Sequence, residues 1–321
     1  MIPYSDFYYF YIMALVLIPA VIIGLCEKKI KYYGMIATAF MIYIIFGKSE
    51  KEFTFLAAYY LIQLFCVYFY IFVSKKFHER FLLWIMISIS ILPLVIVKVR
   101  PALNLSAVGF LGISYLTFKS VQVLIQIYDG HIKSMNLFDF TYFLLFFPTI
   151  SSGPIDRSKR FFKDINSKIK RSEYIELLGK GIWKIALGIG YKFIIAYFIN
   201  EKIIKKIPVH PHSMINIVNY MYSYSFYMFF DFAGYSLIAV GVSYVLGVVT
   251  PENFNKPFIS KDIKQFWNRW HMSLSFWFRD FIYTRFVMAA LKKKWFKSRS
   301  SASYIGFMLT MIAIGFWHGI E

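Results

Sequence analysis

The sequence predicts an all-α protein that crosses the membrane several times, and three features of the chain support this prediction. Hydrophobic residues occupy 59% of the 321 positions, aromatic residues occupy 21%, and the mean hydropathy is +0.56. Apolar runs approach the roughly 20 residues that a membrane-spanning helix needs, and they recur along the chain. Lysine and arginine gather in short segments between these runs, as they do in the cytoplasmic loops of membrane proteins.

Five apolar runs in the first part of the chain are predicted to form membrane helices. The basic segments at 28–31 and 75–80 are separated by two runs, so they share one side, which the positive-inside rule assigns to the cytoplasm. This arrangement places the N-terminus outside the cell. The five runs are residues 7–25, 32–46, 53–73, 81–97 and 108–128.

Lys119 interrupts the fifth run. An ionisable side chain at membrane depth costs about 2.5–3.5 kcal/mol, and such side chains usually face the interior of the protein. We therefore expect Lys119 to face a polar interior or a partner carboxylate.

The middle of the chain combines a short apolar segment, a basic loop and three further runs. Residues 140–147 are too short to span a membrane and are followed by prolines and a glycine, which predicts a re-entrant or interfacial segment. Residues 157–171 hold seven lysines and arginines, which predicts a cytoplasmic loop near anionic headgroups. No internal repeat or linker is evident, so residues 1–321 are predicted to form one integral-membrane domain. The further runs are residues 182–199, 214–230 and 232–249.

From residue 251 the chain becomes polar and rich in turn-forming residues, and an aromatic, charged segment follows at 262–286. Helical spacing in this segment predicts an amphipathic helix that lies at the membrane interface or lines a cavity. One face of the predicted helix carries Trp267, Trp270, His271, Leu274, Phe278 and Phe281.

Two histidines stand out because aromatic, membrane-associated sequence surrounds them. His271 lies within 262–286, and His318 ends the last apolar run. A histidine at membrane depth is normally kept for a function, and imidazole is a general base near neutral pH. Such a base can remove the proton of a hydroxyl that then attacks an activated acyl group. Metal binding is disfavoured, since no carboxylate or thiolate cluster lies near His210 and His212 in the sequence.

The net charge of +19 does not indicate nucleic-acid binding, because the basic residues lie in short loops between membrane runs. This distribution favours contact with membrane lipid or with an acidic protein. At 286–294 an apolar patch adjoins three lysines, which fits either a helix end at lipid headgroups or a docking site for an acidic partner. The residues of this docking patch are Phe286, Val287, Met288, Lys292, Lys293 and Lys294.

A set of short motifs resembles the membrane-bound O-acyltransferase family. Its members, in the order that the family shows, are residues 231–236 (DFAGYS), 251–255 (PENFN), 266–271 (FWNRWH), 274–280 (LSFWFRD) and 315–319 (GFWHG). Three stretches resemble one branch of the family, the teichoic acid D-alanyltransferases: residues 112–118 (GISYLTF), 147–157 (FPTISSGPIDR) and 231–286. Each motif is weak alone, but the set is specific and covers essentially the whole chain.

The resemblance implies that His318 is the catalytic base and that His271 is the second active-site histidine. It implies no bound cofactor, and a donor that carries D-alanine as a thioester on the phosphopantetheine arm of an acidic cytoplasmic carrier protein. The acceptor it implies is teichoic acid at the outer face, with small membrane partners from the same operon. The substrate passage is then expected to be lined by Trp267, Asn268, Arg269, Trp270, Trp317 and Asp231.

The chain departs from the family pattern at its C-terminal end. Members of the family continue past the catalytic histidine with further membrane helices, whereas this chain stops at Glu321, so we expect those C-terminal helices to be missing.

The sequence also leaves three competing functions open. The nearest alternative is an O-acetyltransferase that acts on an exported polysaccharide such as alginate or peptidoglycan. Residues 151–156 and 267–269 favour the D-alanyl branch over this alternative. A transporter is disfavoured by the lack of an internal repeat. A non-catalytic assembly protein is the third competing function, and substitution of its histidines would leave it active.

Overall fold

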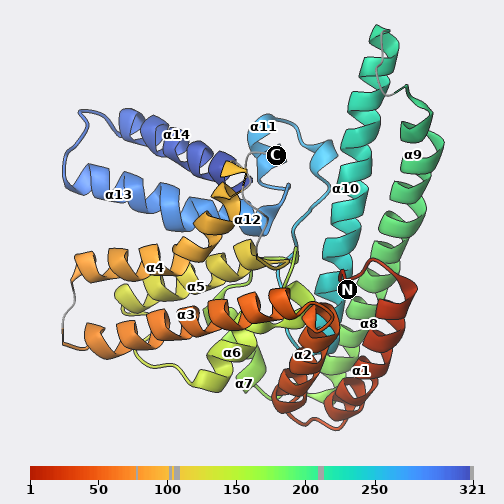
Figure 1. The fold of residues 1–321 in the computed structure, drawn as a ribbon, viewed down its shortest axis with the longest axis horizontal. Coiled ribbons are helices and arrows are strands. Elements are labelled where there is room, and N and C mark those ends of the chain that lie inside the picture. The colour runs from red at the N-terminus through yellow and green to blue at the C-terminus, as the bar shows by residue number, and fades with distance from the viewer. Residues whose placement is uncertain (77–78, 101–102, 105–108, 209–212, 319–321) are drawn as a thin grey trace.

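The computed structural model describes residues 1–76, 79–100, 103–104, 109–208 and 213–318, and its regular structure in these ranges is helical throughout (Figure 1). The α-helices are α1 (Phe7–Leu25), α2 (Lys31–Phe46), α3 (Glu50–Ser74), α4 (Arg80–Val99), α5 (Ile113–Tyr128), α6 (Leu137–Leu145), α7 (Ser158–Asn166), α8 (Arg171–Ile189), α9 (Tyr197–Lys202), α10 (Met214–Val245), α11 (Ile263–Trp267), α12 (Met272–Phe278), α13 (Thr284–Lys292) and α14 (Arg299–His318). The short 3-10 turns are η2 (Phe147–Thr149), η4 (Ile204–Lys206) and η5 (Pro257–Ile259), and the π-helical segments are η3 (Gly190–Ala196) and η6 (Arg279–Tyr283).

Six segments of the described chain are long and apolar enough to cross a membrane. They are α1, α3, α4, the continuous segment from α8 to η4, α10 and α14. Helix α2 and the segment from α6 to η2 are apolar but shorter. The prediction of an all-helical, multi-pass membrane protein is confirmed, whereas the side of the membrane on which each loop lies stays a prediction.

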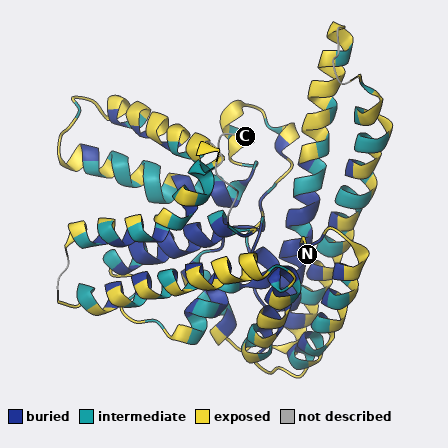
Figure 2. Ribbon diagram, in the orientation of Figure 1, coloured by how far each residue is buried: buried dark blue, intermediate teal, exposed yellow. Residues whose placement is uncertain are grey.

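The helices form two groups with the chain's histidine-bearing segments between them. Helices α3, α4 and α5 lie side by side in one group, and α8 packs along α10 in the other (Figure 1). Helix α12 and the end of α14 lie between the groups. Buried residues concentrate in α5, α6 and the C-terminal half of α10, which form the core of the molecule (Figure 2).

Glycines set the close approach of α8 and α10. Gly181 faces Gly241, and Gly188 faces Gly234, so that a Cβ added at Gly188 would lie 2.7 Å from the Gly234 carbonyl oxygen. Small residues at such positions let two backbones pack closely within a membrane. This contact fixes α10, whose Phe232 packs against His271, one of the two predicted active-site histidines.

The first four helices end close to the predicted limits because polar residues bound their apolar runs. Helix α1 spans the predicted residues 7–25 and begins after Asp6, whose Oδ1 accepts a hydrogen bond from the backbone N–H of Tyr9 at 2.8 Å. A side-chain oxygen at this N-cap position satisfies a backbone donor that has no partner within the helix. The short helix α6 begins at Leu137 and confirms that the apolar segment around 140–147 does not span a membrane by itself.

The predicted separation of residues 214–230 from 232–249 is wrong. Residues 214–245 form the single helix α10, and Asp231 lies inside it. The carboxylate of Asp231 pairs with Nζ of Lys192 in η3. Asp231 therefore lies within a continuous helix, and its charge has a partner on the neighbouring segment.

The prediction of one continuous amphipathic helix at 262–286 is also wrong. The segment is divided into α11, α12, η6 and α13, and the break before α12 falls at His271. The predicted common face is therefore lost. Leu274 and Phe278 are buried, whereas Trp267 is 55% exposed.

Candidate active site

Helix α5 provides the surface on which the two histidine-bearing segments pack. The ring centroid of Phe118 lies 4.6 Å from that of Trp277 in α12 and 5.7 Å from that of Trp317 in α14. Nε1 of Trp277 also donates a hydrogen bond to the carbonyl oxygen of Phe118, at 3.1 Å. Residues distant in sequence therefore meet on one turn of α5: His271 directly precedes α12, and His318 ends α14.

His271 is enclosed by aromatic rings. It is the N-cap residue of α12 and its side chain belongs to the core, with 8% of the residue exposed. The imidazole centroid lies 4.9 Å from the perpendicular ring of Phe232 and 6.4 Å from the nearly parallel ring of Phe254. Within the described part of the chain, Nε2 is buried without a hydrogen-bond partner. Packing thus holds the ring while Nε2 keeps its hydrogen-bonding capacity.

His318 is exposed, in contrast to His271. Its ring centroid lies 4.4 Å from that of Trp317, and its carbonyl oxygen accepts a hydrogen bond from Nζ of Lys98 in α4, at 3.3 Å. Burial lowers the pKa of His271 to about 3, and the charge of His318 acts in the same direction. The two imidazoles are therefore close enough to interact electrostatically. His271 is neutral near pH 7, and the exposed His318 is the better placed of the two to exchange protons with a reactant.

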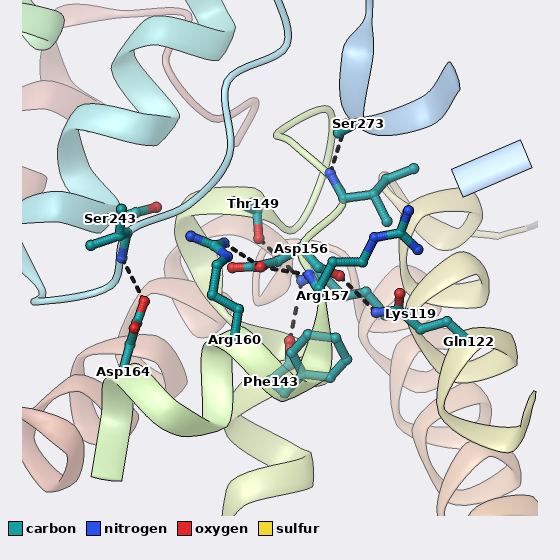
Figure 3. Close-up of polar contacts among 12 residues, drawn as sticks. Lys119, Gln122, Phe143, Thr149, Asp156, Arg157, Arg160, Asp164, Ser243 and Ser273 are labelled. Atoms are coloured by element: carbon teal, nitrogen blue, oxygen red, sulfur yellow. Dashed lines mark hydrogen bonds and ion pairs between the residues drawn. The ribbon is translucent and has the colours of Figure 1, made fainter. Parts of the chain in front are cut away.

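Lys119 faces a polar interior, as predicted from its position in an apolar run. It is 1% exposed, and its Nζ donates hydrogen bonds to the carbonyl oxygens of Phe143 and Leu144, at 3.2 and 3.4 Å, and to Oγ1 of Thr149, at 3.1 Å (Figure 3). Its direct hydrogen-bond partners among the described residues are therefore two carbonyls and a hydroxyl rather than a carboxylate. The lysine satisfies carbonyls at the end of α6 that have no partner within the helix.

The loop at 150–157 is tied to α5 and α7 next to Lys119. Asp156 is buried and pairs with Arg160 of α7, and its carbonyl oxygen accepts a hydrogen bond from Nε2 of Gln122, at 2.7 Å (Figure 3). Burial raises the pKa of Asp156, and the guanidinium of Arg160 opposes this rise. These contacts fix a loop whose Ile155 also reaches α12.

The structure brings only some of the predicted passage residues near the histidines. Trp317 contacts α5 beside His318, as described above. Trp270 packs 5.2 Å from Phe254, between ring centroids, and therefore lies close to the rings around His271. The carboxylate of Asp231 pairs with Lys192. The backbone carbonyl of Arg269 accepts a hydrogen bond from Asn255, while Trp267 and Asn268 are exposed.

The predicted docking patch is divided by the contact between α13 and α14. Phe286 and Val287 lie against Gly306 of α14, so these two side chains are half-buried. Met288 is 64% exposed. The remaining members of the patch are exposed and follow at the end of α13: Lys292, Lys293 and Lys294.

Sequence reasoning missed two polar residues that contact the segment carrying His271. Asn253 is 1% exposed and accepts hydrogen bonds from α12, and Ser273 is 6% exposed. The motif at 251–255 contains Asn253 and was the signal that could have found it, although the motif alone gives no role to that residue. Asn253 and Phe254 also border a cavity of about 230 Å³ between α8, α10 and this loop.

The structure is thus a bundle of apolar helices that encloses His271 and exposes His318, which together form a candidate acid–base site. The chain belongs to the membrane-bound O-acyltransferase family, because the model of that family matches residues 8–321. The family predicted from the motifs is thereby confirmed.

Named relatives refine this assignment. The chain is 46% identical to a teichoic acid D-alanyltransferase of Bacillus subtilis, over 100% of this chain and 84% of that protein. It is 40% identical to a teichoic acid D-alanyltransferase of Streptococcus thermophilus, over 99% of this chain and 79% of that protein. Identity to a probable alginate O-acetylase of Pseudomonas aeruginosa is 31%, over 65% of this chain and 38% of that protein. The resemblance to the D-alanyltransferase branch is confirmed.

Proposed function

We propose that this chain transfers D-alanine to a hydroxyl acceptor for the D-alanylation of teichoic acid. The observation that carries the proposal is the extent of the match: D-alanyltransferases align with the whole chain at 40–46% identity, whereas the alginate O-acetylase aligns with 65% of it. Acid–base chemistry on a membrane scaffold fits this reaction.

In the proposed reaction His318 acts as the general base. It takes the proton of the acceptor hydroxyl while the oxygen attacks the thioester carbonyl of the D-alanyl donor. A C–O ester bond forms, the C–S bond breaks, and the sulfur leaves as a thiol after gaining a proton. His271, held neutral by its aromatic surroundings, binds or orients a reactant through Nε2.

The donor is proposed to be a phosphopantetheine thioester on an acidic carrier protein. The exposed Met288 and the lysines at 292–294 support a cytoplasmic docking surface on α13, because an acidic partner complements their charge. The positive-inside rule supports an N-terminus outside the cell and acceptor chemistry toward that side. Small membrane partners are proposed to take part in the transfer, and teichoic acid is the final acceptor.

The first test measures D-alanine esters on cell-wall teichoic acid in a strain that lacks the gene. Complementation with the wild-type protein should restore the esters, and His318→Ala should leave them near the deletion level, because loss of a general base slows such reactions by about 10²–10⁴-fold. His131→Ala, which changes an exposed histidine, is the matched control. Restoration by His318→Ala would contradict the base role, and unchanged esters on deletion would favour the polysaccharide O-acetyltransferase.

The acid limb of the pH–rate profile should not report the protonation of His271. Because burial lowers the pKa of His271 to about 3, its imidazole stays neutral as the pH falls from about 8 to 5. His271→Asn should therefore lower the rate without moving the midpoint of the acid limb, measured in membrane vesicles with the loaded carrier protein. A shifted midpoint would show that His271 titrates in this range.

The free energy of unfolding should fall as the pH drops below about 6.5. Below this pH the histidine is protonated in the unfolded chain, whereas His271 stays neutral in the folded protein.

A further inference from the structure

The backbone of His271 adopts a conformation that is uncommon for residues other than glycine. Its φ of 41° and ψ of 51° lie in the left-handed region, which a residue other than glycine occupies only where surrounding contacts hold it there. An N-cap residue normally accepts a hydrogen bond from a backbone N–H of the first turn through its own side chain, and His271 makes no such bond. Other residues must therefore stabilise the start of α12.

Asn253 supplies these contacts from a different segment. Met272 is the first residue of α12, and its backbone N–H donates a hydrogen bond to the carbonyl oxygen of Asn253, at 2.8 Å. The side-chain Oδ1 of Asn253 accepts a second hydrogen bond from the hydroxyl of Ser273, at 2.5 Å. The two residues that follow His271 are thus bound to one buried asparagine.

The hydroxyl of Ser273 extends this network to the loop at 150–157. Oγ of Ser273 accepts a hydrogen bond from the backbone N–H of Ile155, at 3.0 Å (Figure 3). One hydroxyl therefore links the loop next to Asp156, the segment of Asn253 and the first turn of α12. Asn253, Ser273 and Ile155 are all nearly inaccessible to solvent, so water does not compete for these bonds.

The same segment places a ring against the imidazole. Phe254, which follows Asn253, stacks nearly parallel to His271. A shift of Asn253 would therefore move both the backbone that precedes α12 and one wall around the imidazole. The backbone direction and the ring position of His271 depend on the same residue.

We propose that Asn253 and Ser273 are positioning residues, which hold His271 in its left-handed conformation and direct its imidazole into the active site. The proposal rests on the proposed function only in giving His271 a part in acyl transfer. The positioning itself concerns the folded protein and can be measured without any substrate.

The experiment compares Ser273→Thr with Ser273→Val in the full-length protein. Threonine keeps the hydroxyl and valine removes it at nearly the same volume, and Ser273→Ala removes it without added volume. Diethylpyrocarbonate, which acylates accessible imidazole, is the probe, and peptide mass spectrometry reads the modification of His271 against that of exposed His131. Thr250→Val is the control, because Oγ1 of Thr250 is also buried in this segment but has no hydrogen-bond partner among the described residues.

The valine and alanine variants should raise the reactivity of His271 about tenfold over the wild type, the effect of losing one buried hydrogen bond. Ser273→Thr and Thr250→Val should stay near the wild type. Asn253→Ala should act like Ser273→Ala, and the double variant should add little, because both remove one network. Equal reactivity in all variants, or equal increases in the threonine and valine variants, would overturn the proposal.

Measurements of D-alanyl transfer kinetics distinguish the positioning role of Ser273 and Asn253 from the proposed role of His271 in acyl transfer. If His271 acts in acyl transfer, Ser273→Val should lower kcat by up to about 100-fold with little change in KM for the loaded carrier, and Ser273→Thr should restore it. Raised reactivity of His271 with normal kcat would support the positioning role and contradict a role of His271 in the reaction. Lowered kcat with normal reactivity would contradict the positioning role alone.

Discussion

Gly188→Leu is expected to separate α8 from α10 and to remove most of the folded protein from the membrane. A Cβ at Gly188 would lie 2.7 Å from the carbonyl oxygen of Gly234, and a backbone atom cannot move aside as a side chain does. Overpacking of a core typically costs about 1–3 kcal/mol, and contact with a neighbouring backbone places this variant at the upper end of that range or above it. Thermal unfolding in detergent, together with the yield of monodisperse protein, measures the effect.

Gly179→Leu is the matched control for this prediction. Gly179 lies in the same helix, is not fully buried, and an added Cβ there meets nothing within 4 Å. Leucine also favours a helix more than glycine does, so this variant should be as stable as the wild type or slightly more stable. Equal melting temperatures for Gly188→Leu and Gly179→Leu would show that α8 and α10 do not pack through these glycines.

Lys119→Met is expected to cause the second large loss of stability. Methionine has a similar length, but it leaves the carbonyl oxygens of Phe143 and Leu144 and the hydroxyl of Thr149 without their donor. A buried polar group left without its partner costs about 1–3 kcal/mol, so the total loss should reach about 3 kcal/mol or more. The melting temperature should fall accordingly, and protease cleavage near α6 should accelerate.

Lys180→Met tests whether the effect belongs to the buried lysine. Lys180 is exposed and forms an ion pair with Glu176 one turn away in α8, an interaction that contributes little in contact with solvent. Its replacement should change the free energy of unfolding by no more than about 0.5 kcal/mol. If Lys119→Met proved equally mild, the hydrogen bonds of Lys119 would not be needed to hold the end of α6.

The membrane helices could be predicted where an apolar run ends at polar residues. Helix α1 matches its predicted limits, whereas α3 begins three residues early at Glu50, because Ser49 caps a polar first turn that hydropathy excludes. Asp231 suggested a break in α10 since its partner, Lys192, lies on another helix. Whether a charged residue in an apolar run interrupts the helix can be decided only when its partner in the folded protein is known.

The motifs indicated the residues of the candidate site but not their geometry. The motifs indicated His271 and His318, and the structure places the segments that carry both beside α5. The break at His271 was not predictable from helical spacing, because Met272 and Ser273, the first residues of α12, donate hydrogen bonds to Asn253 in a different segment. Helical periodicity describes contacts within one segment, whereas this conformation depends on contacts between segments. For Lys119 the sequence predicted a polar environment but not the residues to which it donates hydrogen bonds.

The left-handed backbone at position 271 limits which amino acids evolution or design can place there. β-branched residues are excluded by their Cβ substituents, while glycine fits but offers no side chain. Histidine, asparagine and aspartate are the non-glycine residues most often found in this region, and aspartate would bring a buried negative charge. A saturation library at position 271, sorted for folded protein, should therefore retain mainly histidine, asparagine and glycine. A second sort for D-alanyl transfer activity should enrich histidine. The backbone conformation therefore restricts which amino acids fold at position 271, and the reaction selects among those that do.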